Sequence, residues 1–299
     1  MEFIAAILVR DNAIKDRSLF VSIYKVYFSM AAIYNYCKGG IGMKYPEFKN
    51  IIETMKEHRY DFEADIKRVQ NTANLRKNGE KFPLSKHIEW MVFAQLSNNR
   101  PWQVIEDNRS NIEKIFHNFD PEFLKKVSPD YLRQELIKIK CGNRQIKPQM
   151  NNLPKNIDTL ERIAKENGGS IDNYFNKAPS PLDLAKKLSE SKSEYKLKYI
   201  GLPLACEYIK SAGIDIIKPD VHVCRLLKRL GYIKPASQKS EEKDAVRVCE
   251  EIAKEYNVSS VYVDTALWQY CAEKKFEMCT EANPKCGECK VKNCNNRKK

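Results

Sequence analysis

The sequence predicts an all-α protein, and three observations support that fold class. Apolar residues recur at helical spacing along most of the 299 residues. Ser-Pro and Asp-Pro pairs, which combine a capping residue with a proline in the first turn, mark several helix starts. No convincing alternating strand is bounded by hairpin turns, and the N-terminal "FIAAILV", residues 3–9, is the one segment that could form a strand.

Individual helices can be located from these signals. Behind Pro46, apolar residues at positions 48, 51, 52 and 55 predict an amphipathic helix. The segment "HIEWMVFAQLS", residues 87–97, is apolar on most sides and predicts a central buried helix. Further helices are expected to begin at Asp120-Pro121, Ser128-Pro129 and Ser180-Pro181, to run from Asn156 to Gly168-Gly169, and to cover Pro203 to Ala212. The polar run of residues 76–86 is the best candidate for a linker.

The charge balance points to a polyanionic partner. Lysine and arginine number 52 against 39 aspartate and glutamate residues, which gives a formal net charge of +13. Such a surface attracts phosphate, although a basic protein with no such partner would have the same composition. The length allows one or two domains.

Nothing in the sequence predicts export or a membrane span. "MEFIAAILVRD" has an acidic second residue and a short apolar run, unlike a secretory signal. Residues 18–37 are apolar but contain Lys25 and several polar residues, so they favour a buried helix over a span of roughly 20 apolar residues. We therefore expect a cytoplasmic, nucleoid-associated protein with no membrane partner.

The segment "LKYIGLPLACEYIKSAG", residues 197–213, has the pattern of a helix–hairpin–helix. Leu197, Ile200 and Gly201 lie between two predicted helices, and Gly201 is expected to adopt a positive φ in a tight turn. Such a turn directs backbone N–H groups outward beside a helix N-terminus, where Lys196 and Lys198 would flank a bound phosphate. An ordinary helix–helix corner with a glycine turn fits this pattern equally, and on the pattern alone we favour it.

Asp220 is the most informative carboxylate in the chain. It follows Gly201 by 19 positions and directly precedes the apolar run "VHVCRLLKRLGY". Pro-Asp before such a run is an ordinary N-cap, and the helix dipole keeps a capping aspartate ionised. The capping role is therefore compatible with a catalytic one. His222 favours packing or capping, and Asp215 is expected in a loop.

Four cysteines crowd the C-terminus. Cys37, Cys141, Cys206, Cys224 and Cys249 are scattered among apolar neighbours and indicate ordinary buried thiols. Cys279, Cys286, Cys289 and Cys294 have the spacing C-x6-C-x2-C-x4-C and can surround one metal centre. Zinc and a [4Fe–4S] cluster both accept four thiolates, and either would stabilise a loop with little apolar content.

Taken in order, the hairpin, the downstream aspartate and the four-cysteine loop resemble the helix-hairpin-helix (HhH-GPD) superfamily of base-excision DNA glycosylases, which includes endonuclease III. The resemblance covers about residues 84–294. It implies that Asp220 is catalytic, that the cysteine loop holds a [4Fe–4S] cluster rather than zinc, and that double-stranded DNA is the partner of a monomer. It also implies a DNA-contacting set made up of a wedge residue, its neighbour and the hairpin: Asn99, Asn98, Lys196, Lys198, Tyr199, Ile200, Gly201 and Leu202.

The sequence departs from this family in four places. The lysine with which some members also cleave the strand would stand at Pro203, so we expect a monofunctional glycosylase without an efficient lyase step. Tyr199 occupies the position of the first hairpin glycine. The last cysteine interval is one residue shorter than usual, and residues 1–85 exceed what the family needs before its first barrel helix.

The resemblance also implies a two-lobed architecture. Residues 86–213 would form a six-helix barrel, and residues 1–85 would pack with a C-terminal lobe of residues 214–299, leaving Asp220 in the cleft between the lobes. The expected activity is extrusion of a damaged or mismatched base followed by hydrolysis of its N-glycosidic bond. A non-catalytic DNA-binding protein of the same fold, or a zinc-stapled RNA-binding or scaffold protein, remain the alternatives.

The excised base is not predicted from the sequence. Candidates for the base pocket are Trp90, Trp102, Gln95, Gln145 and Trp268, and for each one core packing is the better interpretation. The polar stretch Cys141 to Gln149 adds Asn143 and Arg144 as candidates that would line the pocket or touch DNA.

Overall fold

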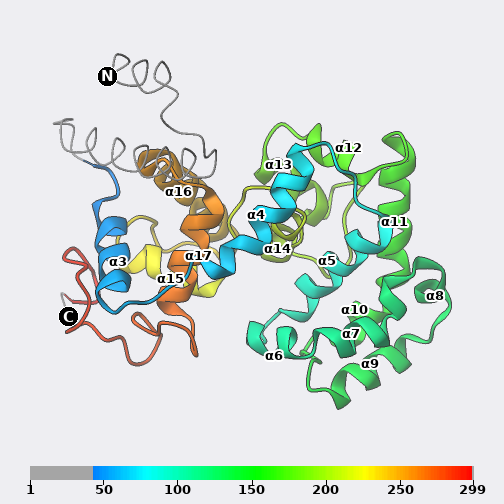
Figure 1. The fold of residues 1–299 in the computed structure, drawn as a ribbon, viewed down its shortest axis with the longest axis horizontal. Helices are drawn as coiled ribbons and strands as arrows, with labels where there is room; N and C mark the ends of the chain where they lie inside the picture. The colour runs from blue at the N-terminus through cyan, green and yellow to red at the C-terminus, as the bar shows by residue number, and fades with distance from the viewer. Residues whose placement is uncertain (1–42, 298–299) are drawn as a thin grey trace, which may run out of the picture. The chain divides into compact units, whose positions relative to one another are not determined.

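Every regular element in the described part of the chain is a helix, so the predicted fold class is confirmed there (Figure 1). The structure is a computed structural model that describes residues 43–297. The possible strand at residues 3–9 and the apolar segment at residues 18–37 lie outside that range. Within it, no helix combines the length and apolar character that crossing a membrane requires.

The helices follow one another with short connections. Their bounds are α3 Pro46–Glu57, α4 Ala64–Lys77, α5 Leu84–Leu96, α6 Trp102–Asp107, α7 Arg109–Ile115, η1 His117–Phe119, α8 Pro121–Lys126, α9 Pro129–Lys138, α10 Ile146–Asn151, α11 Leu153–Glu166, α12 Ile171–Asn176, α13 Pro181–Ser189, α14 Leu202–Ser211, α15 Val221–Arg229, α16 Gln238–Tyr256 and α17 Ser260–Cys271.

Several helix starts lie where the capping signals predicted them. The Asp120 side chain accepts hydrogen bonds from the first amides of α8, and the Ser180 hydroxyl accepts one from the Asp183 N–H of α13. Each bond satisfies an amide that has no partner within the helix.

Helix α5 is the centre of one group of packed helices. Ile88, Met91, Val92 and Leu96 on α5 are fully buried, because the helix is surrounded on most sides. It packs against α14, α11, α8 and η1, while α13 packs on α14 and α9 on α10. This arrangement agrees with the apolar character of its sequence on nearly all faces.

A second group consists of α15, α16 and α17 together with α3 and α4. Helix α17 packs against all four of the others, and α4 also reaches α14 of the first group. Helix α3 contacts the C-terminal loop, where Glu47 accepts hydrogen bonds from the amides of Lys292 and Asn293. The predicted division at residues 85/86 and 213/214 stays a prediction.

The predicted linker is shorter than expected. Arg76 belongs to α4 and is buried: its guanidinium lies 2.6 Å from the Asp172 carboxylate and donates to the Ala212 carbonyl at 2.8 Å. Only residues 78–83 lie between α4 and α5. Gly213 follows α14 at φ 84°, where a Cβ would lie 2.8 Å from the Ala73 nitrogen, so only glycine allows α4 to approach this closely.

Candidate active site

Asp220 has one carboxylate oxygen committed to the fold and one available. Its Oδ1 accepts hydrogen bonds from the amides of His222 at 2.9 Å and Val223 at 3.1 Å, which confirms the predicted N-cap of α15. Its Oδ2 accepts no hydrogen bond from any described residue. The side chain is partly exposed, and the adjacent Val221 is 68% exposed, so the free oxygen is not enclosed by core packing.

A buried cluster of four charges lies beside this aspartate. Lys210 Nζ is 3.0 Å from Glu207 Oε2 and 2.7 Å from Asp264 Oδ2. Lys218 Nζ is 3.7 Å from the same Glu207 oxygen, and the Lys218 amide donates to Asp264 Oδ1 at 3.2 Å. The cluster therefore fixes the segment that leads into Asp220 to both α14 and α17.

The two cations and two anions of this cluster alter one another's proton affinity. Burial alone would raise the pKa of Glu207, but Lys210 and Lys218 outweigh it and lower that pKa to about 2. The carboxylates of Asp264 and Glu207 likewise overcome burial and raise the pKa of Lys210. For Asp264 burial dominates, so its pKa is raised despite the bond to Lys210. Lys210 is therefore a protonated ammonium ion, unsuited to nucleophilic attack.

The structure contains the predicted hairpin, but the residue with a positive φ is Tyr199 and not Gly201. Tyr199 has φ 57°, whereas Gly201 has φ −88° and acts as the N-cap residue of α14. The prediction of a positive φ at Gly201 is therefore wrong. Leu197 and Ile200 are fully buried, which anchors the turn on both sides of its tip. The amides of Tyr199 and Gly201 donate no hydrogen bond within residues 43–297.

Two buried amide side chains hold the hairpin backbone at Lys198. The Asn156 side chain accepts from the Lys198 amide at 2.6 Å and donates to the Lys198 carbonyl at 3.1 Å. Gln95 Nε2 donates to the same carbonyl at 3.5 Å. Both amides are fully buried, so the turn has a fixed position relative to α5 and α11.

The C-terminal end of α5 brings the predicted site segments together. Gln95 contacts the hairpin, and two residues later the Ser97 hydroxyl accepts from Lys218 Nζ at 3.3 Å. The turn continues to Asn98, which is partly buried, and Asn99, which is exposed at φ 52°. The hairpin and the segment before Asp220 are therefore both hydrogen-bonded to the helix end that continues into the turn of Asn98 and Asn99.

The lysines of the hairpin differ in environment. Lys196 Nζ donates to the Ile200 carbonyl; burial, with a smaller contribution from Lys198, lowers the pKa of Lys196 to about 8. Lys198 is exposed and its ammonium contacts no described partner. Leu202, by contrast, is nearly buried and contributes to packing.

Most of the other sequence candidates pack or brace the fold. The Asn143 amide donates to the Gln95 carbonyl at 2.9 Å and to Gln149 at 3.1 Å, so it braces the end of α5 instead of lining a pocket. Arg144 and Gln145 are exposed. Trp90 is buried edge-on against Phe82 and His87, and Trp102 and Trp268 are partly buried under cations.

Asp215 and His222 also have defined places. The Asp215 carboxylate accepts from the amides of Ser260 and Val261 at the start of α17, a capping role that its loop position did not suggest. The His222 ring lies 3.1 Å from Arg225, and burial lowers the pKa of His222 although the charge of Asp220 raises it.

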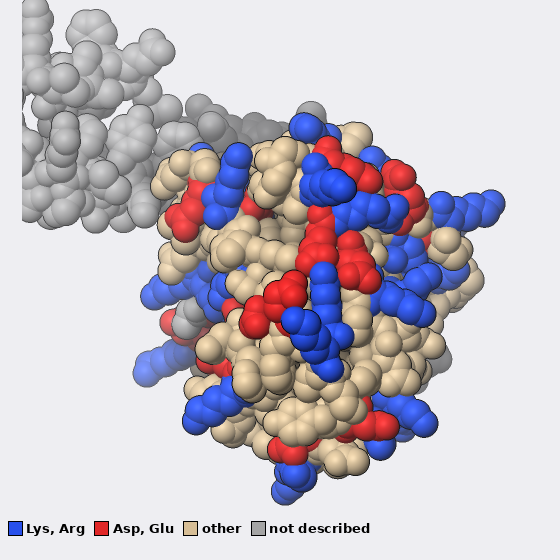
Figure 2. All heavy atoms as spheres, turned by 90° about the vertical axis from the view of Figure 1, so that its right-hand side faces the viewer, with Lys and Arg blue, Asp and Glu red and all other residues tan. Residues whose placement is uncertain are grey.

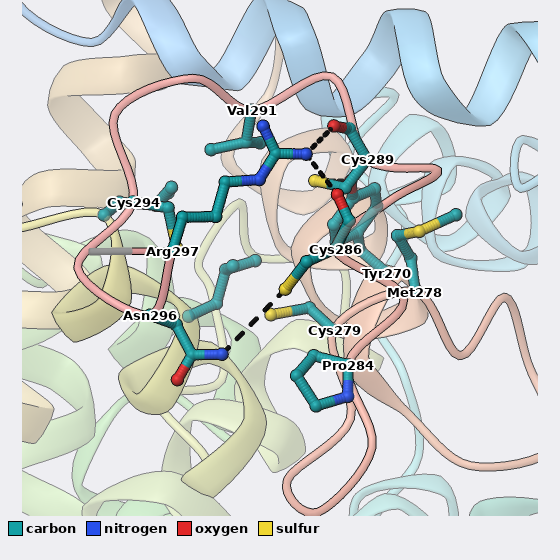
Figure 3. Close-up of a pocket in the computed structure, with 12 residues that line it drawn as sticks. Tyr270, Met278, Cys279, Pro284, Cys286, Cys289, Val291, Cys294, Asn296 and Arg297 are labelled. Carbon is teal, nitrogen blue, oxygen red and sulfur yellow. Dashed lines mark hydrogen bonds between the residues drawn. The ribbon is translucent and has the colours of Figure 1, made fainter. Parts of the chain in front are cut away.

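The four C-terminal cysteines line one pocket (Figure 3). Arg229, at the end of α15, donates to the Cys279 sulfur at 3.1 Å, and the Tyr270 hydroxyl lies 2.9 Å from the Cys289 sulfur. Arg297 donates to the carbonyls of Cys286 and Cys289 and closes the loop (Figure 3). The Arg229 guanidinium is a donor that stabilises a thiolate at Cys279, whereas burial raises the pKa of Cys289 despite its contact with Tyr270.

Cys271 is a neighbour of this loop that the spacing pattern did not include. Hydrogen bonding from Cys271, with a further contribution from Arg229, outweighs burial and lowers the pKa of Cys279 to about 6. Cys271 ends α17, eight residues before Cys279, and is fully buried. Cys271 lies close to Cys279 because the chain turns back after α17, and the spacing of the cysteines does not reveal that turn.

The four thiols of the loop are donors that suit a thiolate-bound metal group. Their side chains are not gathered around one point in this structure. Among the described His, Cys, Asp and Glu side chains, no three are placed to hold a metal ion together. The enclosed space is about 20 Å³, enough for about one water molecule.

The face at the α8 and α11 end of the structure carries both signs of charge. Figure 2 shows lysine and arginine side chains interspersed with acidic ones on this face. Lys125 of α8, for example, lies 2.5 Å from Glu161 of α11. The excess positive charge of the chain therefore does not form one uniform patch on this side.

Comparison with known proteins identifies the fold. No protein-family model matches the chain, and no curated protein sequence matches it at a significant level. Its structure is similar to that of the Methanocaldococcus jannaschii 8-oxoguanine glycosylase/lyase in complex with a 15-mer DNA containing 8-oxoguanine, with a TM-score of 0.51 and 18% identity over 75% of this chain and 95% of that one. The chain has the fold of a DNA glycosylase.

A second structure from the same archaeon agrees. The crystal structure of the Methanocaldococcus jannaschii 8-oxoguanine DNA glycosylase matches with a TM-score of 0.50 and 18% identity, covering 75% of this chain and 92% of that chain. The expected glycosylase fold is thus confirmed at the level of architecture.

Proposed function

We propose that this protein is a base-excision DNA glycosylase that uses Asp220 to hydrolyse the N-glycosidic bond of an extruded nucleotide. One observation carries the proposal. Asp220 keeps a free carboxylate oxygen at the start of α15, and the segment before it is bonded to the same helix end as the hairpin and the turn of Asn99. The DNA glycosylase fold supports it.

The chemistry follows from the state of this carboxylate. Cleavage of the N-glycosidic bond passes through a sugar with oxocarbenium character. The free oxygen of Asp220 can stabilise that positive charge and orient the attacking water. Its other oxygen, bonded to two amides, fixes the group in position without a large movement during the reaction.

DNA would be held by the hairpin and opened by the wedge turn. The unbonded amides of Tyr199 and Gly201 and the unpaired ammonium of Lys198 are suited to phosphate. Asn99 is exposed on a turn with a positive φ and would occupy the space that the extruded nucleotide leaves. We propose double-stranded DNA as the substrate of a monomeric enzyme.

The proposed activity is monofunctional. Position 203 carries proline, which has no amine to form a Schiff base. Of the nearest lysines in sequence, Lys198 lies on the hairpin turn before α14, and Lys210 is ion-paired with Glu207, which favours its unreactive charged form. Borohydride treatment of a reaction mixture should therefore trap no protein–DNA adduct, although base release proceeds.

We further propose that Cys279, Cys286, Cys289 and Cys294 hold a [4Fe–4S] cluster, with zinc as the alternative. The all-thiol donor set and the N–H and O–H groups directed at its sulfurs support this assignment. The group would hold the C-terminal loop in its folded form. Anaerobically prepared protein should show the broad visible absorption of an iron–sulfur cluster, and a colourless protein containing only zinc would contradict the assignment.

The experiment that tests the function is single-turnover base release from a panel of damaged duplexes. Both similar structures are of 8-oxoguanine glycosylases, so 8-oxoguanine is the first base to test, followed by uracil, alkylated purines and thymine mismatches. Release of one of these bases with an intact strand supports the proposal. Tight DNA binding without release of any base would instead support a non-catalytic DNA-binding protein with the same fold.

A further inference from the structure

The hairpin ends in an aromatic side chain that the fold does not use. Tyr199 is 49% exposed, its hydroxyl makes no hydrogen bond, and its ring makes no aromatic or cation–π contact with another described residue. The residues on both sides of this tip behave differently, since Leu197 and Ile200 are fully buried. The ring therefore contributes little to folding through packing.

Holding a tyrosine at this position has a cost. Its φ of 57° lies in the left-handed region, which costs a residue with a Cβ about 1 kcal/mol more than glycine. The backbone cannot relax easily, because Asn156 and Gln95 hold Lys198 on the preceding side. A rigid, strained turn that presents an unused aromatic ring indicates a binding role for the ring.

The surroundings of the ring match a nucleic-acid strand. Lys198, next to it, is exposed and has no carboxylate partner among residues 43–297. The amides of Tyr199 and Gly201 are unbonded on either side of Ile200. An aromatic ring flanked by a free cation and free amides is the combination with which proteins bind unpaired nucleotides, the ring stacking on a base and the other groups binding phosphate.

We propose that Tyr199 is a stacking platform for an unpaired nucleobase, so that the protein binds DNA with a missing or unpaired nucleotide more tightly than fully paired duplex. The faces of paired bases are covered by their neighbours in an intact duplex. A ring at a rigid turn finds an uncovered face only where a nucleotide is missing or a base is unpaired. The inference rests on the proposed function in one respect, namely that the hairpin faces DNA.

The test uses fluorescence anisotropy with undamaged, fluorescein-labelled DNA, either fully paired or lacking one internal nucleotide. Stacking of one base contributes about 1–3 kcal/mol, so Tyr199→Ala should weaken binding to the gapped DNA about 5- to 150-fold. Binding to the paired duplex should change by about twofold or less, and Tyr199→Phe should keep the preference because it keeps the ring.

Two further variants separate binding from stability. Tyr199→Gly removes the ring and the strain together, so it should raise the midpoint of urea unfolding while lowering gapped-DNA affinity as much as Tyr199→Ala. Tyr131→Ala removes a tyrosine of similar exposure, 44%, on α9 and should change neither DNA affinity. Equal affinities of the wild type for gapped and paired DNA, or a preference that survives in Tyr199→Ala, would overturn the inference.

The outcome is independent of catalysis because the DNA carries no lesion. A Tyr199-dependent preference in a protein that releases no base would leave the inference standing and defeat the proposed function. Base release by a protein without this preference would support the proposed function and overturn the inference about Tyr199.

Discussion

The charge cluster beside Asp220 gives a prediction whose size can be worked out from the structure. Glu207→Gln keeps the shape of the side chain but removes the negative charge that lies 3.0 Å from Lys210 and 3.7 Å from Lys218. Lys210 then keeps only Asp264 as a partner, and the Lys218 ammonium keeps the Ser97 hydroxyl but no carboxylate among the described residues. The variant should be folded but less stable, and the segment leading to Asp220 should be less firmly held.

Two routes give the same magnitude for the loss of stability. The pKa of Glu207 falls from an ordinary value of 4.5 to about 2, which corresponds to about 3 kcal/mol of stability. Removing one partner of a buried ion pair costs about 3–5 kcal/mol. Because the pKa is lowered on folding, this stabilisation is fully present above pH 4.5 and is lost as the pH falls towards 2.

Urea unfolding followed by circular dichroism measures the effect. At pH 7 the free energy of unfolding of Glu207→Gln should be about 3 kcal/mol below that of the wild type. The difference should shrink steadily between pH 5 and pH 2. Glu135→Gln, which removes a surface pair with Lys138, serves as the control and should change stability little at any pH. A difference that is small at pH 7, or that does not depend on pH, would refute the role assigned to the cluster.

Three further predictions concern the other site residues. Asn99→Ala should slow single-turnover base release by about tenfold or more with little change in unfolding, because an unfilled gap favours return of the nucleotide to the stack; an unchanged rate would remove Asn99 from the mechanism. Lys198→Ala should weaken binding to all duplexes alike and reduce the slope of log affinity against log salt by about 1, as loss of one phosphate contact requires; an unchanged slope would contradict that contact. Cys289→Ser should abolish the visible absorption of anaerobically prepared protein, whereas Cys249→Ser, at a buried thiol remote in sequence, should keep it; equal absorption in both variants would exclude Cys289 as a ligand.

The local features of the fold were predictable from sequence because they depend on neighbouring residues. Asp120, Ser180 and Asp220 accept hydrogen bonds from amides two or three residues downstream, so the signal and its effect lie within one turn. The central helix α5 was predictable in the same way, from apolar residues on most of its sides.

The features that were predicted wrongly or not at all depend on contacts between distant parts of the chain. The hairpin backbone is held at Lys198 by Asn156 and Gln95, which lie 42 and 103 residues away in sequence, and so the positive φ was predicted at Gly201 and not at Tyr199. The charge cluster was missed because Asp264 lies 54 residues beyond Lys210.

The predicted site residues differ in how accessible they are in the structure. Asp220 is partly exposed and Asn99 is exposed, so neither side chain is taken up by core packing, and their assigned roles stay predictions. Ile200 and Leu202 are buried or nearly so and support the hairpin instead of contacting DNA directly. The base pocket could not be derived from sequence, since its polar candidate Asn143 is occupied in bracing α5.

Single-turnover excision by Asp220→Asn tests the central claim most directly. Asparagine caps helices as well as aspartate does, so the bonds to the amides of His222 and Val223 are retained while the negative charge is removed. Asp120→Asn makes the same change at the cap of α8 and controls for capping. We predict that base release by Asp220→Asn falls about 100-fold or more with DNA affinity maintained, while Asp120→Asn keeps its activity; full activity in Asp220→Asn would show that its carboxylate serves the helix alone.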